Sequence, residues 1–218
     1  MNESTGADAV LALLIMTDLL LLGSSRLRSC IAMAALQGVV VSLLPVLLHG
    51  GEGAVRPWIL TGGSMVLKGA VFPWLLLRVL RESGVRREVE PFIGHTLSVV
   101  VGVGALMFSI WVGSQLALPA PVAASLSLMV PAGLATLLIG LFLIVSRRTA
   151  ITQVLGYVVV ENGIYAIGVT LVGGVPMLVE LGVLMDVFVA VFIMSIAAYH
   201  ISREFDHIDV DQLDRLRG

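Results

Sequence analysis

Charged residues are scarce in this sequence, and their scarcity indicates its class. Only 13% of the 218 residues are charged, whereas 58% are hydrophobic, and the mean hydropathy is +1.02. A soluble domain carries about 25% charged residues, so this chain lacks the polar surface that keeps a folded domain in water. We therefore predict an integral membrane protein.

Cysteine and lysine are almost absent, with one residue of each, Cys30 and Lys68. A single cysteine excludes an internal disulfide and a cysteine-ligated iron–sulfur cluster. Neither a phosphate-binding glycine loop nor a nucleophile elbow occurs. The histidines lie at the ends of apolar runs or in the tail, without metal-site or haem-site spacing: His49, His95, His200 and His207. We expect no catalytic residue, metal site or bound cofactor in this chain.

Long apolar runs are abundant. A helix needs about 20 mostly apolar residues to span a membrane, and lipid-exposed backbone must satisfy its own hydrogen bonds. Met1–Ala7 is polar and acidic, so we expect the first run to be a retained helix rather than a signal peptide. The alternation of a membrane β-barrel is absent. The sequence predicts an all-α polytopic membrane protein with seven spans, at Asp8–Gly23, Cys30–His49, Pro57–Val79, Phe92–Trp111, Val122–Val145, Ala150–Leu171 and Met177–Tyr199.

The arginines indicate the orientation of these spans. Positively charged loops stay on the inner side of a membrane. With seven crossings, only Arg56 falls on the outer side. The N-terminus is therefore predicted outside and the C-terminus inside. The arginines on the inner side are Arg26, Arg28, Arg78, Arg81, Arg86, Arg87, Arg147, Arg148, Arg203, Arg215 and Arg217.

Two stretches of the chain open alike, which predicts a duplication. "SRLRSCIAMAALQGVVV" begins at Ser25 and "SRRTAITQVLGYVVVEN" at Ser146, and Arg-Glu pairs at Arg81 and Arg203 follow two spans later. Spans one to three and five to seven would run in the same directions, with span four as the extra crossing. We predict an N-terminal three-helix repeat at 1–90, a linking helix at 91–121, and a C-terminal repeat with a cytoplasmic tail at 122–218.

Three charged residues lie near the middle of their spans: Lys68, Glu161 and Asp186. A charge at the bilayer centre costs about 2.5–3.5 kcal/mol on insertion scales, so such residues face protein or water. Glu161 lies roughly 16 Å into its span at 1.5 Å per residue. Further polar candidates are Gln37, which corresponds to Glu161 in the repeat, Asp18 near the inner surface and Glu180 near the outer surface.

Tyr157, Glu161 and Tyr165 are four residues apart and share one helix face, which Gln153 continues. Such a face favours an ordered chain of waters. Burial favours a protonated carboxyl and a nearby ammonium favours the ionised form, so Glu161 is a candidate for proton exchange. The alternative is structural, because buried polar residues and ion pairs also hold helices together. Gly156 and Gly163 are predicted to serve close helix packing.

The stretches "GYVVVENG", "LVELGVLMDVFVAV" and "IDVDQLDRLRG" resemble component E (HyfE-type) of group-four membrane-bound nickel–iron hydrogenases, including formate hydrogenlyase complexes. The likeness extends weakly through "LKGAVFPWLLL" in the first half. The last three spans are also similar to the K-type subunit of complex I and the C-type subunit of Mrp antiporters, whose proton path includes acids on two adjacent helices. By this resemblance Glu161 is the first acid. The second is Asp186, with Glu180 as its competitor.

The resemblance implies a multi-pass subunit in the prokaryotic inner membrane that provides a carboxylate path for protons or Na⁺. It implies nickel–iron and iron–sulfur centres on partner subunits. Expected partners are antiporter-like and quinone-site-like membrane subunits, a peripheral hydrogenase arm and lipid, but no nucleic acid. Three alternatives stay open: a non-conducting scaffold of such a complex, a subunit of an Mrp-type antiporter, or a small-solute permease.

Overall fold

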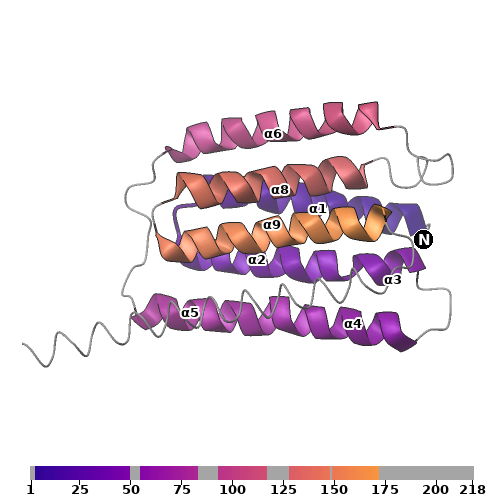
Figure 1. Cartoon of the computed structure of the whole chain (residues 1–218). Coiled ribbons are helices and arrows are strands. Elements are labelled where there is room, and N and C mark those ends of the chain that lie inside the picture. Colours follow the sequence, from indigo (N-terminus) through magenta and orange to yellow (C-terminus); the bar gives the residue numbers. More distant parts are fainter. Residues whose placement is uncertain (1–2, 50–54, 83–92, 117–127, 148, 172–218) are drawn as a thin grey trace, which may run out of the picture.

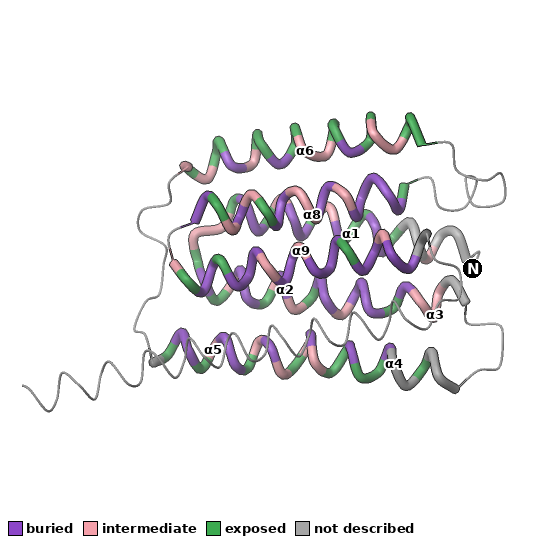
Figure 2. The backbone as a smooth tube through the Cα atoms, viewed as in Figure 1, coloured by how far each residue is buried: buried purple, intermediate pink, exposed green. Residues whose placement is uncertain are grey.

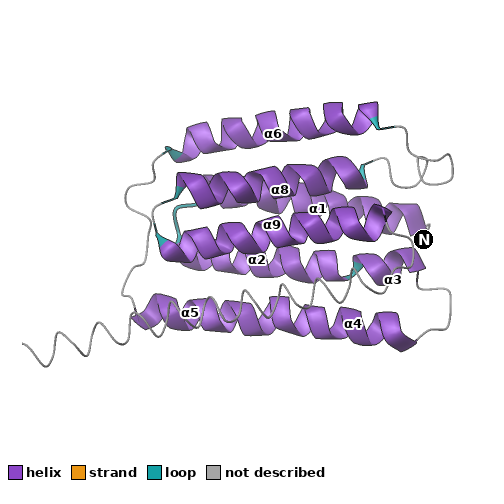
Figure 3. Ribbon diagram, in the orientation of Figure 1, coloured by secondary structure: helices purple, strands orange, loops and turns teal. Residues whose placement is uncertain are grey.

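The described part of the chain is a bundle of helices. The computed structural model describes residues 3–49, 55–82, 93–116, 128–147 and 149–171, and no β-strand occurs within these ranges. All helices run along one common axis (Figures 1 and 3). They are α1 (Glu3–Gly23), α2 (Leu27–Ser42), α3 (Leu44–His49), α4 (Val55–Val66), η1 (Leu67–Val71), α5 (Phe72–Glu82), α6 (His95–Gln115), α8 (Met129–Ser146) and α9 (Ala150–Leu171).

The helices match the predicted membrane spans. Five stretches of the described residues are long and apolar enough to cross a membrane, and α1 adds a shorter apolar stretch at Ala9–Gly23. The last helix within the described ranges, Ala150–Leu171, has the predicted bounds. The predicted seventh span, Met177–Tyr199, lies outside the described residues. The five stretches are Leu27–Leu47, Thr61–Arg81, His95–Gln115, Met129–Ser146 and Ala150–Val169.

Successive spans alternate in direction (Figure 1). The helices α1, α5 and α8 finish at the same end of the bundle at which α2, α6 and α9 begin. We call this the arginine end, since it carries Arg26, Arg28, Arg78, Arg81 and Arg147. This arrangement agrees with the predicted clustering of arginines on one side.

Two spans depart from a regular α-helix, and proline accounts for both departures. The second span is interrupted at Leu43, between α2 and α3, because Pro45 has no N–H to donate to the preceding turn. In the third span, Pro73 crowds the carbonyl of Gly69. The chain there widens into the π-helix η1, in which the Phe72 N–H bonds to the Leu67 carbonyl.

The interior contains two apolar clusters at different heights along the bundle. One lies toward the arginine end and includes Leu22, Ile31 and Phe72, while the other lies toward the opposite end and includes Leu14, Val41 and Met129. The helix α9 is central, with 67% of its span buried, whereas only 17% of the α6 span is buried (Figure 2). Between the two clusters every central helix carries buried polar side chains.

Candidate functional site

Seven polar side chains form one layer across the bundle, between the two apolar clusters. On α1, for example, Asp18 lies between Leu14 of one cluster and Leu21 of the other, and on α9 Glu161 lies between Val159 and Tyr165. All seven side chains are buried. We call this set the polar layer: Thr17 and Asp18 of α1, Gln37 of α2, Lys68 of η1, Thr136 of α8, and Glu161 and Asn162 of α9.

A buried ion pair is the centre of the polar layer. The Nζ of Lys68 lies 2.7 Å from Oε1 of Glu161, and both side chains are only 2% exposed. Lys68 also donates a hydrogen bond of 3.2 Å to Oδ1 of Asn162, and its Nζ lies 5.1 Å from the centre of the Tyr165 ring. The pair joins residues 93 positions apart in the sequence, from the predicted N-terminal and C-terminal halves.

The local fold of the third span explains how Lys68 reaches the interior. It occupies the π-helix η1, whose wider turn displaces the backbone from the regular helical path. Gly38 of α2 faces it, and a Cβ on Gly38 would lie 2.7 Å from the Lys68 Cβ. Reciprocally, a Cβ on Gly69 would lie 2.6 Å from a methyl group of Val39. These two glycines let α2 and η1 approach closely enough to seat the lysine.

Two amides connect the ion pair to Asp18. Nδ2 of Asn162 donates to Oε1 of Gln37 at 3.2 Å, and Nε2 of Gln37 donates to Oδ1 of Asp18 at 2.7 Å. The orientation of both amides follows from the ends of this chain, because an ammonium can only donate and a carboxylate can only accept. The chain of hydrogen bonds, which we call the amide relay, therefore points from Lys68 to Asp18.

Asp18 is completely enclosed and accepts hydrogen bonds on both oxygens. Besides Gln37 on Oδ1, the Oγ1 of Thr136 lies 2.7 Å from Oδ2. The same Oγ1 lies 3.0 Å from the backbone carbonyl of Ala132. A hydroxyl has one hydrogen and two lone pairs, so Thr136 can donate to an ionised Asp18. It can equally accept from a protonated Asp18 while it donates to Ala132.

Glu161 differs from Asp18 in its environment. Its Oε1 is held by the ion pair with Lys68, whereas no described residue donates a hydrogen bond to its buried Oε2. A buried carboxylate oxygen normally has a donor or an ordered water. Glu161 thus combines a counter-ion on Oε1 with a buried Oε2 to which no residue of the described ranges donates.

The outcomes for the predicted site residues vary. Lys68, Glu161, Gln37 and Asp18 are brought together, and Tyr165 borders the group. Tyr157 is partly buried against the apolar cluster of the arginine end. Gln153 is exposed, and its Nε2 bonds to the Arg147 carbonyl at 3.2 Å, so the predicted polar line on α9 does not extend to it. Asp186 and Glu180 lie outside the described residues.

Two members of the polar layer, Asn162 and Thr136, were not identified from the sequence. Both are uncharged, and their roles arise from what they contact rather than from their own chemistry. Asn162 directly follows Glu161, so an amide beside an intramembrane acid was the available signal. Thr136 gave none, because a hydroxyl in a membrane helix commonly bonds to its own helix backbone.

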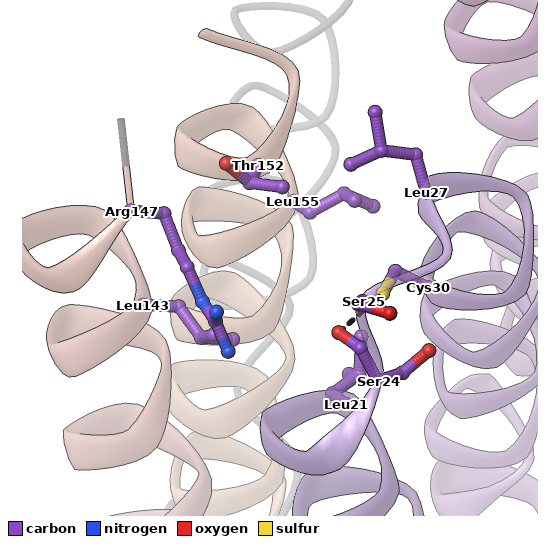
Figure 4. A pocket seen from close by; sticks show the side chains of 9 residues that line it. All are labelled: Leu21, Ser24, Ser25, Leu27, Cys30, Leu143, Arg147, Thr152 and Leu155. Carbon is purple, nitrogen blue, oxygen red and sulfur yellow. Dashed lines mark hydrogen bonds between the residues drawn. The ribbon is translucent and has the colours of Figure 1, made fainter. Parts of the chain in front are cut away.

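A small pocket beside the buried Arg147 lies at the arginine end of the bundle. Figure 4 shows the pocket there, lined by Ser24, Ser25, Leu27, Cys30, Thr152 and neighbouring leucines beside Arg147. Nη2 of Arg147 donates to the Leu22 carbonyl at 3.0 Å, and Nη1 lies 3.3 Å from Nε2 of His95. A cation at the carbonyl end of α1 satisfies its last turn and complements the helix dipole. Arg147 therefore fastens α1, α6 and α8 together.

In the described ranges no group of three or more histidine, cysteine, aspartate or glutamate residues is placed to bind a metal ion. The chemistry available in the polar layer is instead that of two carboxylates, one ammonium and the amides between them. Such groups exchange protons and hold charge, but they transfer no electrons.

Comparison with known proteins identifies the family. The family model of NADH-ubiquinone/plastoquinone oxidoreductase chain 4L matches residues 128–218. The uncharacterized protein Rv0085 of Mycobacterium tuberculosis is 31% identical, with 99% of this chain and 98% of that protein covered. Hydrogenase-4 component E of Escherichia coli K12, like that of Shigella flexneri, is 24% identical over the full length of both chains. No solved structure matches.

These matches fit the structure. The range matched by the chain 4L model begins at the start of α8 and contains position 161, while the likeness to component E covers the full length of the chain. A bundle of apolar helices with buried charges is consistent with the match to chain 4L and with the similarity to component E. The chain belongs to the component E family of complex I-like membrane hydrogenases, whose C-terminal part is related to chain 4L of the NADH–quinone oxidoreductases.

Proposed function

We propose that this chain is a membrane-arm subunit of a complex I-like nickel–iron hydrogenase, in which Lys68 and Glu161 form part of a path for protons or Na⁺. The observation that carries this proposal is the buried ion pair, 2.7 Å from Nζ to Oε1. An ion pair excluded from water is costly to assemble, and intramembrane ionisable residues typically mark proton relays. Redox chemistry would occur at nickel–iron and iron–sulfur centres on partner subunits.

The direction of the polar layer supports a position between other membrane subunits. Its members lie on neighbouring helices at one height, so it crosses the bundle at right angles to the helix axes. Apolar clusters separate it from both ends of the bundle. Charge would therefore move within the plane of the membrane, toward antiporter-like and quinone-site-like neighbours. Asp186 or Glu180 would supply the next acid, and Tyr157 would line the path.

The proposal includes the topology predicted from the sequence. We place the arginine end at the cytoplasmic side, with seven spans, the N-terminus outside and the tail inside. The alternating directions of the helices support it (Figure 1). We also propose that 122–218 duplicates 1–90, with a linking helix at 91–121. In this duplication α1 corresponds to α8 and α2 to α9. The helices of each corresponding pair run in the same direction and contact each other, which supports the duplication.

A scaffold without transport is the second candidate, and one observation favours it. Hydrogen bonds and the ion pair of the polar layer tie five helical segments to one another, which by itself fixes the order of the helices. The two candidates differ in what they require of Glu161. A path needs its ability to bind and release a proton, whereas a scaffold needs only its shape and its bond to Lys68.

Glu161→Gln distinguishes the two, because glutamine keeps the shape but binds no proton. In the purified complex reconstituted in vesicles, we expect gas turnover to continue while protons or Na⁺ transported per turnover fall by about a hundredfold, the scale of removing a positioned acid–base group. Gln153→Ala, an exposed site on the same helix, should change neither quantity. Unchanged pumping in Glu161→Gln would refute the transport role, and failure of the complex to assemble would favour the scaffold.

A further inference from the structure

The ionisable groups of the polar layer are unequal in number: two carboxylates, Asp18 and Glu161, face one ammonium, Lys68. If both acids were ionised, the described layer would carry a net negative charge between two apolar clusters. An unbalanced charge in such surroundings is expensive and is neutralised by taking up a proton. One proton shared by the two acids brings the described part of the layer to neutrality.

We propose that Asp18 is a second proton-binding acid. Asp18 and Glu161 carry one proton in alternation, and Lys68 and the amide relay couple their charge states. This inference deepens the proposed function and rests on it for its role in transport. In the resting arrangement Glu161 is ionised, because Lys68 contacts it directly at 2.7 Å. Asp18, which reaches Lys68 only through two amides, then holds the proton.

The hydrogen bonds around Asp18 fit both of its charge states without a change in backbone. In the protonated state the acid O–H on Oδ2 donates to Oγ1 of Thr136, at 2.7 Å, and Thr136 donates to the Ala132 carbonyl, at 3.0 Å. In the ionised state Thr136 turns its hydrogen to Oδ2. Gln37 donates to Oδ1 at 2.7 Å in either state. The Ala132 carbonyl, one helical turn before Thr136, supplies the acceptor that the protonated state requires.

The amide relay transmits charge but not protons, since an amide passes a proton only through a high-energy tautomer. When Glu161 takes a proton from water on Oε2, the negative charge beside Lys68 at Oε1 is neutralised. The relay, whose donors all point toward Asp18, then favours ionised Asp18, and the Oδ2–H proton leaves to water. One proton is bound and one released, so the layer stays neutral. Gln37 and Asn162 are positioning residues in this exchange.

No other charged group within the described helices competes at this height. Among helices that contact α1, Arg28 of α2, His95 of α6 and Arg147 of α8 lie at the arginine end, and His49 of α3 lies at the opposite end. Lys68 is the cation that the amide relay joins to Asp18. The charge of Asp18 should therefore follow the charge of Glu161.

Infrared spectra of the full chain in its assembled complex test this coupling. The carbonyl stretch of a protonated carboxylic acid is resolved from that of a carboxylate and shifts on exchange into D₂O. We expect a band equivalent to one acid in the wild type that is lost in Asp18→Asn. The same band should be lost in Glu161→Gln, although Asp18 is intact there, and retained in Glu161→Asp. Persistence of the Asp18 band in Glu161→Gln, or its absence from the wild type, would overturn the proposal.

Two further variants keep the test decisive if Glu161→Gln fails to assemble. Lys68→Met should double the acid band, since both carboxyls must then be protonated; no increase contradicts the shared lysine. Gln37→Leu should raise the frequency of the Asp18 band by removing the hydrogen bond to its carbonyl oxygen, whereas Gln153→Ala should leave it unchanged. The bands report charge, not pumping. Unchanged pumping in Glu161→Gln would thus refute the transport role. The infrared bands alone decide whether Asp18 binds the proton.

Discussion

Asn162 carries no charge, yet it determines how Lys68 is shared between two acids. Its Oδ1 accepts from Lys68 and its Nδ2 donates to Gln37, so the ammonium is joined to Glu161 directly and to Asp18 through the amide relay. A buried charge must be paired and hydrogen-bonded to be tolerated. At the scale of single residues, the amides make a site with three ionisable side chains possible in an apolar bundle.

Removing Lys68 alone should destabilise the protein more than removing the whole ion pair. In Lys68→Met, Glu161 loses its counter-ion and must be buried in its protonated form, and breaking a buried pair in this way costs about 3 kcal/mol. The thermal midpoint of the detergent-solubilised chain should fall by about 6 °C or more. Lys68→Met combined with Glu161→Leu should recover most of that loss, because a pair replaced by apolar side chains is close to neutral in stability.

Thermal unfolding followed by size-exclusion chromatography measures both variants. Gln153→Ala is the matched control, since its side chain is exposed and lies outside the polar layer. A loss in the double variant equal to the sum of the losses in Lys68→Met and Glu161→Leu would show that the two residues contribute independently, against the 2.7 Å contact.

The charged members of the site were predictable, and the uncharged ones were not. A charge in an apolar run is conspicuous, so Lys68, Glu161 and Asp18 stand out in the sequence. Asp18 was assigned to the inner surface from its distance to the end of its span, but the packing of α1 against α2 and α8 encloses it completely. Asn162 and Thr136 gain their roles from partners 94 to 125 residues away, which no local pattern encodes.

At the scale of elements, close packing of α8 and α9 holds the Glu161 side of the site. Gly133 and Gly140 of α8 face Gly163 and Gly156 of α9, and a Cβ on any of them would lie under 3.0 Å from the other helix. Small residues at such positions let membrane helices approach through their backbones. The predicted packing role of Gly156 and Gly163 is confirmed.

Gly140→Ala should therefore separate α8 from α9 and disturb the site at a distance. A Cβ there would lie 2.5 Å from the Val160 backbone nitrogen, and backbone cannot move aside as a flexible side chain can. We expect a loss of about 1–3 kcal/mol from overpacking, measured by thermal unfolding in detergent. Gly104→Ala on α6 is the control, because nothing lies within 4 Å of its Cβ position and alanine favours helix there. Equal effects of the two substitutions would contradict the packing argument.

Helix positions followed from apolar run length, but their irregularities did not. Hydropathy predicts where a helix lies, and the bounds of α9 agree exactly with the run Ala150–Leu171. The break at Leu43 and the π-turn at Leu67–Val71 depend on how Pro45 and Pro73 are accommodated by neighbouring helices. The π-turn matters for the proposed path because it contains Lys68.

At the scale of the whole molecule, the site lies where the two halves of the chain meet. Four contacts of the polar layer join residues before position 69 to residues after position 135: Asp18 to Thr136, Gln37 to Asn162, and Lys68 to Glu161 and Asn162. In a parallel repeat, sites form at the interface between repeats. The additional N-terminal half thus supplies the lysine and a second acid to a C-terminal half related to chain 4L.

Cysteine labelling of intact cells tests how this molecule crosses the membrane. Cys30 is the natural cysteine of the chain, so Cys30→Ser gives a background free of thiols. Into it we would introduce one cysteine at a time, at the exposed positions Arg81, on the arginine end, or Gln115, on the opposite end, or at Gln212 in the tail. A membrane-impermeant maleimide should label Gln115→Cys in intact cells. It should label Arg81→Cys and Gln212→Cys only after the membrane is opened.

Labelling of Gln212→Cys from outside would leave an even number of crossings and refute the seventh span. Labelling of Arg81→Cys from outside would reverse the bundle, since the positive-inside rule places the arginine end in the cytoplasm.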